Sequence, residues 1–150
     1  MAPLVLGILV VLVAIAGAPR AAAAEDVGTV KVSRGAARIE RGSQRLPAAV
    51  GAKVRQGDVV VTGADGSVGI TFSDNSLLSI GPDSRLAIER FAFDPTTHKG
   101  AFEASLGKGT LAGISGKIAK QSPDAMKVKT PAALLGVRGT EFLIRTGDPQ

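Results

Sequence analysis

The chain has 150 residues, a net charge of +5 and no cysteine, which is enough length for one domain with a hydrophobic core. The absence of cysteine excludes disulfides and thiol chemistry, and a single histidine leaves few ligands for zinc. Five phenylalanines are the only aromatic residues, and the basic residues do not gather in one run. The stacking surface and basic stripe of nucleic-acid binders are therefore missing.

The first predicted element is an export signal. Residues 4–16 are apolar without interruption, which is shorter than the roughly 17–25 residues that span a bilayer. The run has the length of a signal-peptide core, and Ala22 and Ala24 supply the small residues that a signal peptidase requires. We predict cleavage after Ala24, so that residues 1–24 are a signal peptide and residues 25–150 are a periplasmic or secreted domain. Because only the amine of Met1 is positively charged before the run, an uncleaved inner-membrane anchor is the alternative.

From Gly28 onward the hydrophobic pattern has a period of two, which predicts β-strands. Val30 and Val32, for example, are predicted to lie on one face of a strand, with Lys31 and Ser33 on the other. The 19 glycines and 8 prolines suit an all-β chain with many tight turns. A Gly57-Asp58 turn is predicted directly before a short apolar strand.

The central segment repeats a turn followed by a short strand. Asp65, Asp74 and Asp83 are spaced nine residues apart, each beside small residues and before an apolar stretch. Aspartate favours turns because its side chain bonds to nearby backbone. This unit is typical of the rungs of a β-solenoid, since one turn and strand cannot bury its own apolar face. A calcium-binding nonapeptide repeat shares the period but needs paired glycines that these units lack, so the aspartates are interpreted as turn residues.

Later elements are also predicted as strands and turns. The phase of the apolar residues shifts between Ile88 and Phe91, which indicates a bulge. Residues 94–100 are predicted to form an exposed turn or hairpin, and residues 140–146 the last strand. We predict no helix after the signal peptide.

No pattern of residues indicates an enzyme. His98 lies in a polar loop beside a lysine, where histidine is normally solvated. No serine has the G-x-S-x-G spacing of a nucleophile elbow. Residues 113–117 contain Gly-Lys without the spacing of a phosphate-binding loop. We therefore expect a non-catalytic protein without metal or cofactor.

Near the C-terminus, Arg138 is predicted to have a structural role. Thr130-Pro131 is predicted to begin a strand, where the missing N–H of proline does no harm. The residues expected to be buried around a bend at Arg138, Gly139 and Thr140 are Leu134, Leu135, Val137, Phe142 and Ile144. A guanidinium there can donate to backbone carbonyls freed by the bend, or to a carboxylate. We therefore interpret Arg138 as a clasp in preference to a ligand contact, and expect its loss to cost a few kcal/mol.

With these residues in view, the sequence resembles the FecR-type domain. Residues 128–144 contain a Thr-Pro-x-Ala segment followed by Val-Arg-Gly-Thr-x-Phe, the most recognisable part of that family. Residues 27–42, 54–88 and 106–118 match the same pattern in the same order. The resemblance covers residues 27–144.

The resemblance implies an exported all-β domain of the β-helix-like, twin-layer type. The best-known members are periplasmic parts of membrane-spanning regulators, which receive a signal from an outer-membrane receptor and control a cytoplasmic sigma factor. This chain has no cytoplasmic region before its apolar run and ends soon after Phe142, so it looks like the short, freestanding exported members.

The function expected from the resemblance is a binding or interaction module that recognises an envelope protein or another envelope component through a strand edge or loop surface. One alternative is a regulatory component of a cell-surface signalling pathway that acts through a separate transmembrane protein. Another is a structural unit that self-associates by stacking. The basic surface allows weak attraction to anionic envelope lipids.

Overall fold

The computed structural model describes Gly17 and residues 25–147. The predicted signal peptide, residues 1–24, lies outside these residues apart from Gly17, so its cleavage stays a prediction. No helix within the described part of the chain is long and apolar enough to cross a membrane.

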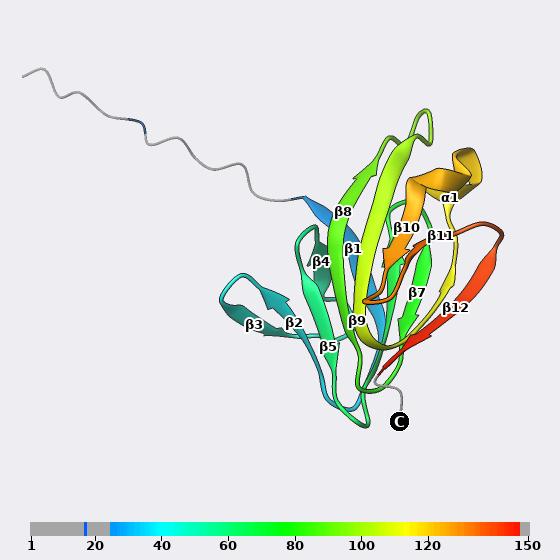
Figure 1. Ribbon diagram of the computed structural model, residues 1–150. Helices are drawn as coiled ribbons and strands as arrows, with labels where there is room; N and C mark the ends of the chain where they lie inside the picture. Colours follow the sequence, from blue (N-terminus) through cyan, green and yellow to red (C-terminus); the bar gives the residue numbers. More distant parts are fainter. Residues whose placement is uncertain (1–16, 18–24, 148–150) are drawn as a thin grey trace, which may run out of the picture.

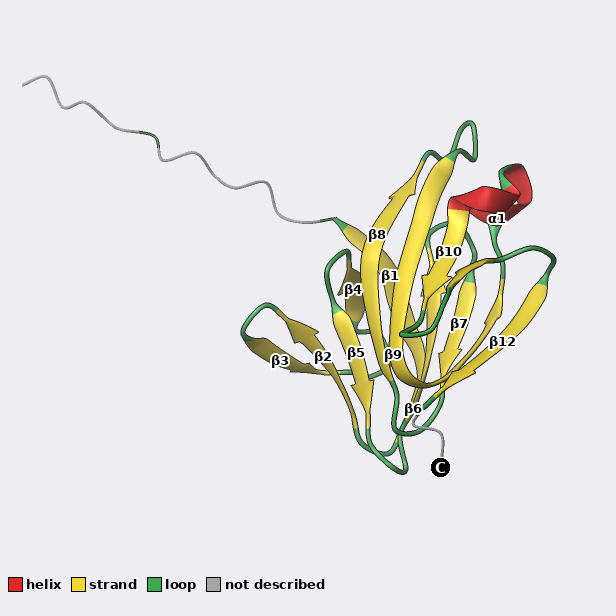
Figure 2. Cartoon of the chain, in the orientation of Figure 1, coloured by secondary structure: helices red, strands yellow, loops and turns green. Residues whose placement is uncertain are grey.

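Strands make up 58% of the described chain and helices 6%, which confirms the all-β prediction (Figure 2). The early strands are β1 (Asp26–Arg34), β2 (Ala37–Arg41), β3 (Gln44–Pro47), β4 (Lys53–Arg55), β5 (Val59–Thr62), β6 (Ser67–Phe72) and β7 (Leu77–Ile80). The later strands are β8 (Arg85–Phe93), β9 (Gly100–Ile114), β10 (Met126–Lys129), β11 (Leu134–Gly136) and β12 (Glu141–Thr146).

These strands form one curled sheet in which β9 is shared by two halves (Figure 1). Residues 100–108 of β9 pair with β8, and residues 111–114 pair with β7. The β8 half contains β3, β2, β5, β8, the first part of β9, β10 and β11. The β7 half contains β4, β1, β6, β7, the second part of β9 and β12.

The solenoid part of the fold prediction is not confirmed. The predicted unit of a turn and a strand is present after each aspartate, but the turn at Asp74 reverses the chain. Asn75 has a φ of 68° there, and the Phe72 N–H donates to the Ser76 carbonyl at 2.9 Å. As a result β6 and β7 pair antiparallel, and β8 crosses to the other half beside β5. Within residues 25–147 only β9 and β10 pair in parallel.

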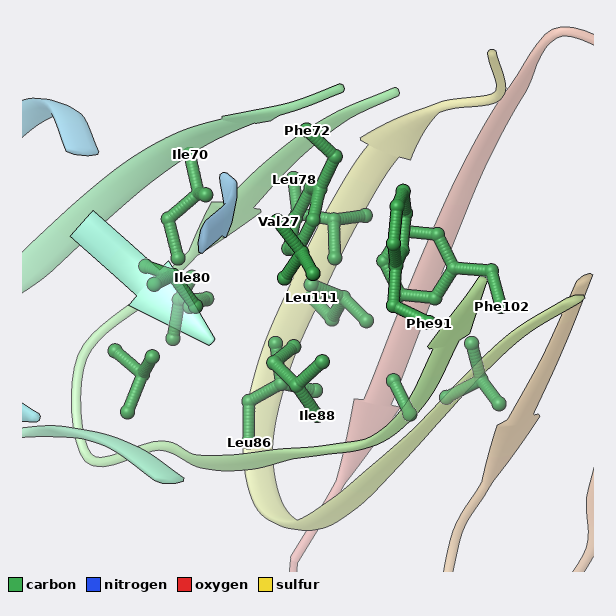
Figure 3. Packing of buried hydrophobic residues seen from close by; sticks show 14 of the residues in the cluster. Val27, Ile70, Phe72, Leu78, Ile80, Leu86, Ile88, Phe91, Phe102 and Leu111 are labelled. Carbon is green, nitrogen blue, oxygen red and sulfur yellow. The ribbon is translucent and has the colours of Figure 1, made fainter. Parts of the chain in front are cut away.

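The hydrophobic core lies between the two halves of the sheet (Figure 3). Its centre is a cluster of Phe72, Phe91 and Phe102, whose ring centroids lie 4.7–5.6 Å apart. In β6, buried Val68, Ile70 and Phe72 alternate with half-buried Ser67, Gly69 and Thr71. In β6 the period of two in the sequence therefore reports which face points inward. In β1 it does not, because the register shifts between Val30 and Val32, so that Val30 is buried and Val32 is 47% exposed.

Two local predictions have clear outcomes. The bulge is confirmed, because the register of β8 against β9 shifts between Ile88 and Arg90. The prediction of no helix is wrong, since a short helix α1 (Lys117–Gln121) is followed by a 3₁₀ turn η1 (Pro123–Ala125). One helical turn is too short to give a recognisable 3.6-residue period, so it escapes detection from the sequence.

Candidate binding surface

The Thr-Pro segment forms a turn and does not begin a strand. Thr130 and Pro131 lie in the loop that joins β10 to β11, where the Thr130 N–H donates to the Ala133 carbonyl at 2.8 Å. Leu134 and Leu135, expected to be buried, are exposed on β11, with 64% of Leu134 accessible. Val137 is buried as expected. The difference arises because β11 has β10 as its one neighbour in the described chain, so nothing covers its outer side.

The expected burial of Arg138 is also wrong. Its side chain is 77% exposed, and its Nη2 lies 3.2 Å from Oδ1 of Asp124, which is 83% exposed. A carboxylate is one of the two kinds of partner expected from the sequence, the other being backbone carbonyls. Such a solvated pair contributes only about 0–1 kcal/mol to stability.

The bend at residues 138–140 is held by Ser115 instead. The hydroxyl of this buried serine donates to the Gly139 carbonyl at 2.6 Å, and its N–H donates to the Thr140 carbonyl at 2.8 Å. Gly139 has a φ of 95°, which favours glycine. Ser115 lies in residues 113–117, where the sequence pattern gives no indication of this structural role.

The ion pair between Asp58 and Arg41 is stronger than the one between Arg138 and Asp124. The Asp58 side chain is 1% exposed and accepts two hydrogen bonds from Arg41, at 2.9 and 2.8 Å, and one from the Arg55 N–H at 2.8 Å. The hydrogen bond with Asp58 raises the pKa of Arg41. Asp58 thus fixes the turn predicted with Gly57, and Arg41 is the partner that the sequence did not indicate.

The three evenly spaced aspartates lie in three separate turns. Asp74 is buried and accepts hydrogen bonds from both the N–H and the hydroxyl of Ser76, at 3.0 and 2.8 Å. Asp65 is exposed and accepts the Ala36 N–H at 3.2 Å. Asp83 is exposed in a turn with a φ of 49°. In the residues that the structure describes, no three His, Cys, Asp or Glu side chains converge as metal ligands would.

His98 lies in the loop between β8 and β9 with its ring stacked on Phe93, 6.1 Å between centroids. It is half-buried by this contact. The position gives it a packing role at the end of the hairpin.

A shallow groove runs across the outward face of the β7 half, with a volume of about 520 Å³. Gly69, Ser79 and Ala112 lie opposite one another on adjacent strands, so small side chains occupy the middle of the sheet face. Larger apolar side chains stand around them. This surface, called the outer groove, is lined mainly by Val32, Gly69, Leu77, Ser79, Ala112 and Ile114.

β12 borders the outer groove and forms an open edge of the sheet. It contributes Glu141, on its outward face, to the lining of the groove, and it pairs with β9 alone among the described strands. In Figure 1 it is the outermost strand on its side of the molecule. Leu143, at its centre, is 66% exposed. Phe142 and Ile144 pack against the core from the other face.

The fold and these surfaces define an all-β domain. A family model described as FecR protein matches residues 58–150, well over half of the chain, so this chain belongs to the FecR family. The matched range contains β5 to β12, and β1 to β4 precede it. The FecR family is one of cell-surface signalling regulators. No curated protein and no solved structure matches the chain.

Proposed function

We propose that this protein is a non-catalytic, exported interaction module that binds a protein in the cell envelope by strand addition at β12. The observation that carries the proposal is the open edge of β12, with its exposed Leu143. Export to the periplasm rests on the apolar run and the Ala22-x-Ala24 site, and the non-catalytic role rests on the lack of reactive side-chain patterns.

Strand addition needs a free row of backbone hydrogen-bonding groups. Four strands have a single neighbour in the described chain, namely β3, β4, β11 and β12. Proteins protect such edges by keeping them short or by placing proline in them. β4 and β11 have three residues each, and β3 ends at Pro47, whereas β12 has six residues without proline or glycine. β12 is therefore the edge best suited to receive a partner strand.

Family membership favours a second candidate, a regulatory component of a cell-surface signalling pathway that acts through a separate transmembrane protein. Such a component also needs a docking surface, and the β12 edge would supply it. The two candidates differ in the identity of the partner.

The test places a photoreactive benzoylphenylalanine at Leu143 in the full chain, expressed in intact cells. A matched control carries the same group at Val50, which is equally exposed at 66% but lies in a turn between β3 and β4. We expect a discrete protein adduct after irradiation at Leu143 and none at Val50. Equal labelling at both positions would contradict binding at β12. If the captured protein spans the membrane, the signalling candidate is favoured.

A further inference from the structure

We propose that the strand added at β12 comes from a second copy of this chain, antiparallel to the first about a two-fold axis through Leu143. The inference rests on the proposed function, because it names the partner of the same edge. Three features of β12 support it: the direction of its backbone groups, its side-chain order and the surface that pairing would create.

The backbone register leaves alternate residues free to pair. The Ser115 N–H donates to the Thr140 carbonyl, and these two residues lie opposite each other in the continuation of the β9–β12 ladder. Hydrogen-bonded pairs alternate along an antiparallel ladder. The N–H and C=O groups of Phe142 and Ile144 therefore point to β9, and those of Glu141, Leu143 and Arg145 point away.

A two-fold axis through Leu143 places these outward groups opposite one another. Leu143 faces Leu143 of the second copy, and Glu141 faces Arg145 of the second copy at both ends. Every facing pair is of the hydrogen-bonded kind, so the two edges satisfy each other's donors and acceptors. An isologous contact of this type closes after two copies.

The side chains agree with this register. Glu141, Leu143 and Arg145 are all exposed on the outward face, in the order acidic, apolar, basic. The order becomes complementary to itself when the strand is reversed. Neither Glu141 nor Arg145 has an ion-pair partner in the described part of this chain. An axis shifted by one residue would set Glu141 or Arg145 against Leu143 and lose both charge pairs.

Pairing would also extend the binding surface. Facing residues of an antiparallel pair project from the same side of the sheet. The β7 halves of the two copies would form one continuous sheet, with both outer grooves on one face. The exposed Leu143 side chains would cover each other at the junction between the grooves.

Cysteine cross-linking tests the register directly, because the chain contains no cysteine of its own. Facing residues in such a pair have a Cα separation that a disulfide can bridge. In the full chain in intact cells, Leu143→Cys should form a disulfide dimer under mild oxidation. Ser79→Cys, exposed on the outward face of β7, is the matched control and should remain monomeric. Glu141→Cys alone should also remain monomeric, but it should form a dimer when co-expressed with Arg145→Cys.

Charge reversal tests the side-chain complementarity. Glu141→Arg and Arg145→Glu should each weaken self-association about tenfold, since two attractive pairs become repulsive. A mixture of the two variants should associate at least as tightly as the unsubstituted chain, because each repulsive contact is replaced by an attractive one. Lys31→Glu changes the charge by the same amount as Arg145→Glu, at an exposed position of β1, and should leave self-association unchanged.

The outcomes separate this inference from the proposed function. The second copy is not the partner if Leu143→Cys forms no more dimer than Ser79→Cys. The same conclusion follows if mixing the two charge variants does not restore self-association. A photo-adduct at Leu143 with a different protein would then preserve the proposed function. If neither the photo-adduct nor the disulfide dimer forms, the proposed function and the pairing of two copies are both contradicted.

Discussion

Two arginine–carboxylate pairs lie in two regions of this molecule, and they differ in almost everything except their chemistry. At the turn between β4 and β5, Arg41 donates twice to Asp58, whose side chain is nearly inaccessible to water. In the C-terminal segment, Arg138 meets Asp124 in open solvent. Burial makes the first pair essential to its turn, because an unpaired carboxylate there would remain desolvated. The second pair is screened by water and adds little.

The contrast extends to the surrounding residues. The central turns are fixed by buried polar groups such as Asp74 and Ser76, and apolar side chains point to the core. The C-terminal segment exposes Leu134 and Leu143. The part of the sequence that identifies the family most clearly is thus largely a surface, which suits recognition better than stability.

The largest expected effect is at the buried pair. Asp58→Ala should lower the free energy of unfolding by about 3 kcal/mol, because Arg41 loses its partner and the Arg55 N–H loses its acceptor. Urea denaturation of the purified protein measures this. Asp124→Ala is the matched control at the exposed pair and should cost under about 0.5 kcal/mol. Equal losses would show that burial does not distinguish the two regions.

An intermediate effect is expected where the two regions meet. Ser115→Ala should cost about 1 kcal/mol, since the Gly139 carbonyl loses its hydroxyl donor at a partly buried hydrogen bond. Ser79→Ala, at an exposed position on β7, should leave the unfolding midpoint unchanged. A negligible loss for Ser115→Ala would mean that another group holds the bend.

The smallest effect is expected at Arg138. Arg138→Ala should lower the free energy of unfolding by less than about 1 kcal/mol, and a double-mutant cycle with Asp124→Ala should give a coupling of similar or smaller size. A loss of several kcal/mol would support the structural role predicted for Arg138 from the sequence. It would contradict the difference between the buried and the exposed ion pair.

Much of the local structure follows from the sequence. Alternation identifies the inward residues of β6, the Gly57-Asp58 turn lies before β5, and the bulge lies after Ile88. These features depend on neighbours in the chain. Strand pairing does not, because it joins distant residues such as Leu77 and Ile114. A repeat of turns and strands suits both a solenoid and a set of hairpins, and turn geometry decides between them.

The candidate surface is predictable only in part. The acidic, apolar, basic order of Glu141, Leu143 and Arg145 can be read directly from the sequence. Whether that strand has a free side depends on which elements flank β9, and only the fold settles this. The misplacement of Arg138 has a similar cause. A bend needs some donor, and the sequence could not show that Ser115, which follows β9 directly, would provide it.

The shared strand β9 has a consequence for biogenesis. Its first part completes one half of the sheet and its second part completes the other. Neither half can therefore form fully before these fifteen residues are present. A nascent polypeptide that stops before residue 100 lacks the strand shared by the two halves and leaves one edge of β7 and one edge of β8 unpaired. Because each half of the sheet needs β9, we expect the native sheet to form late, after most of the chain has been synthesised.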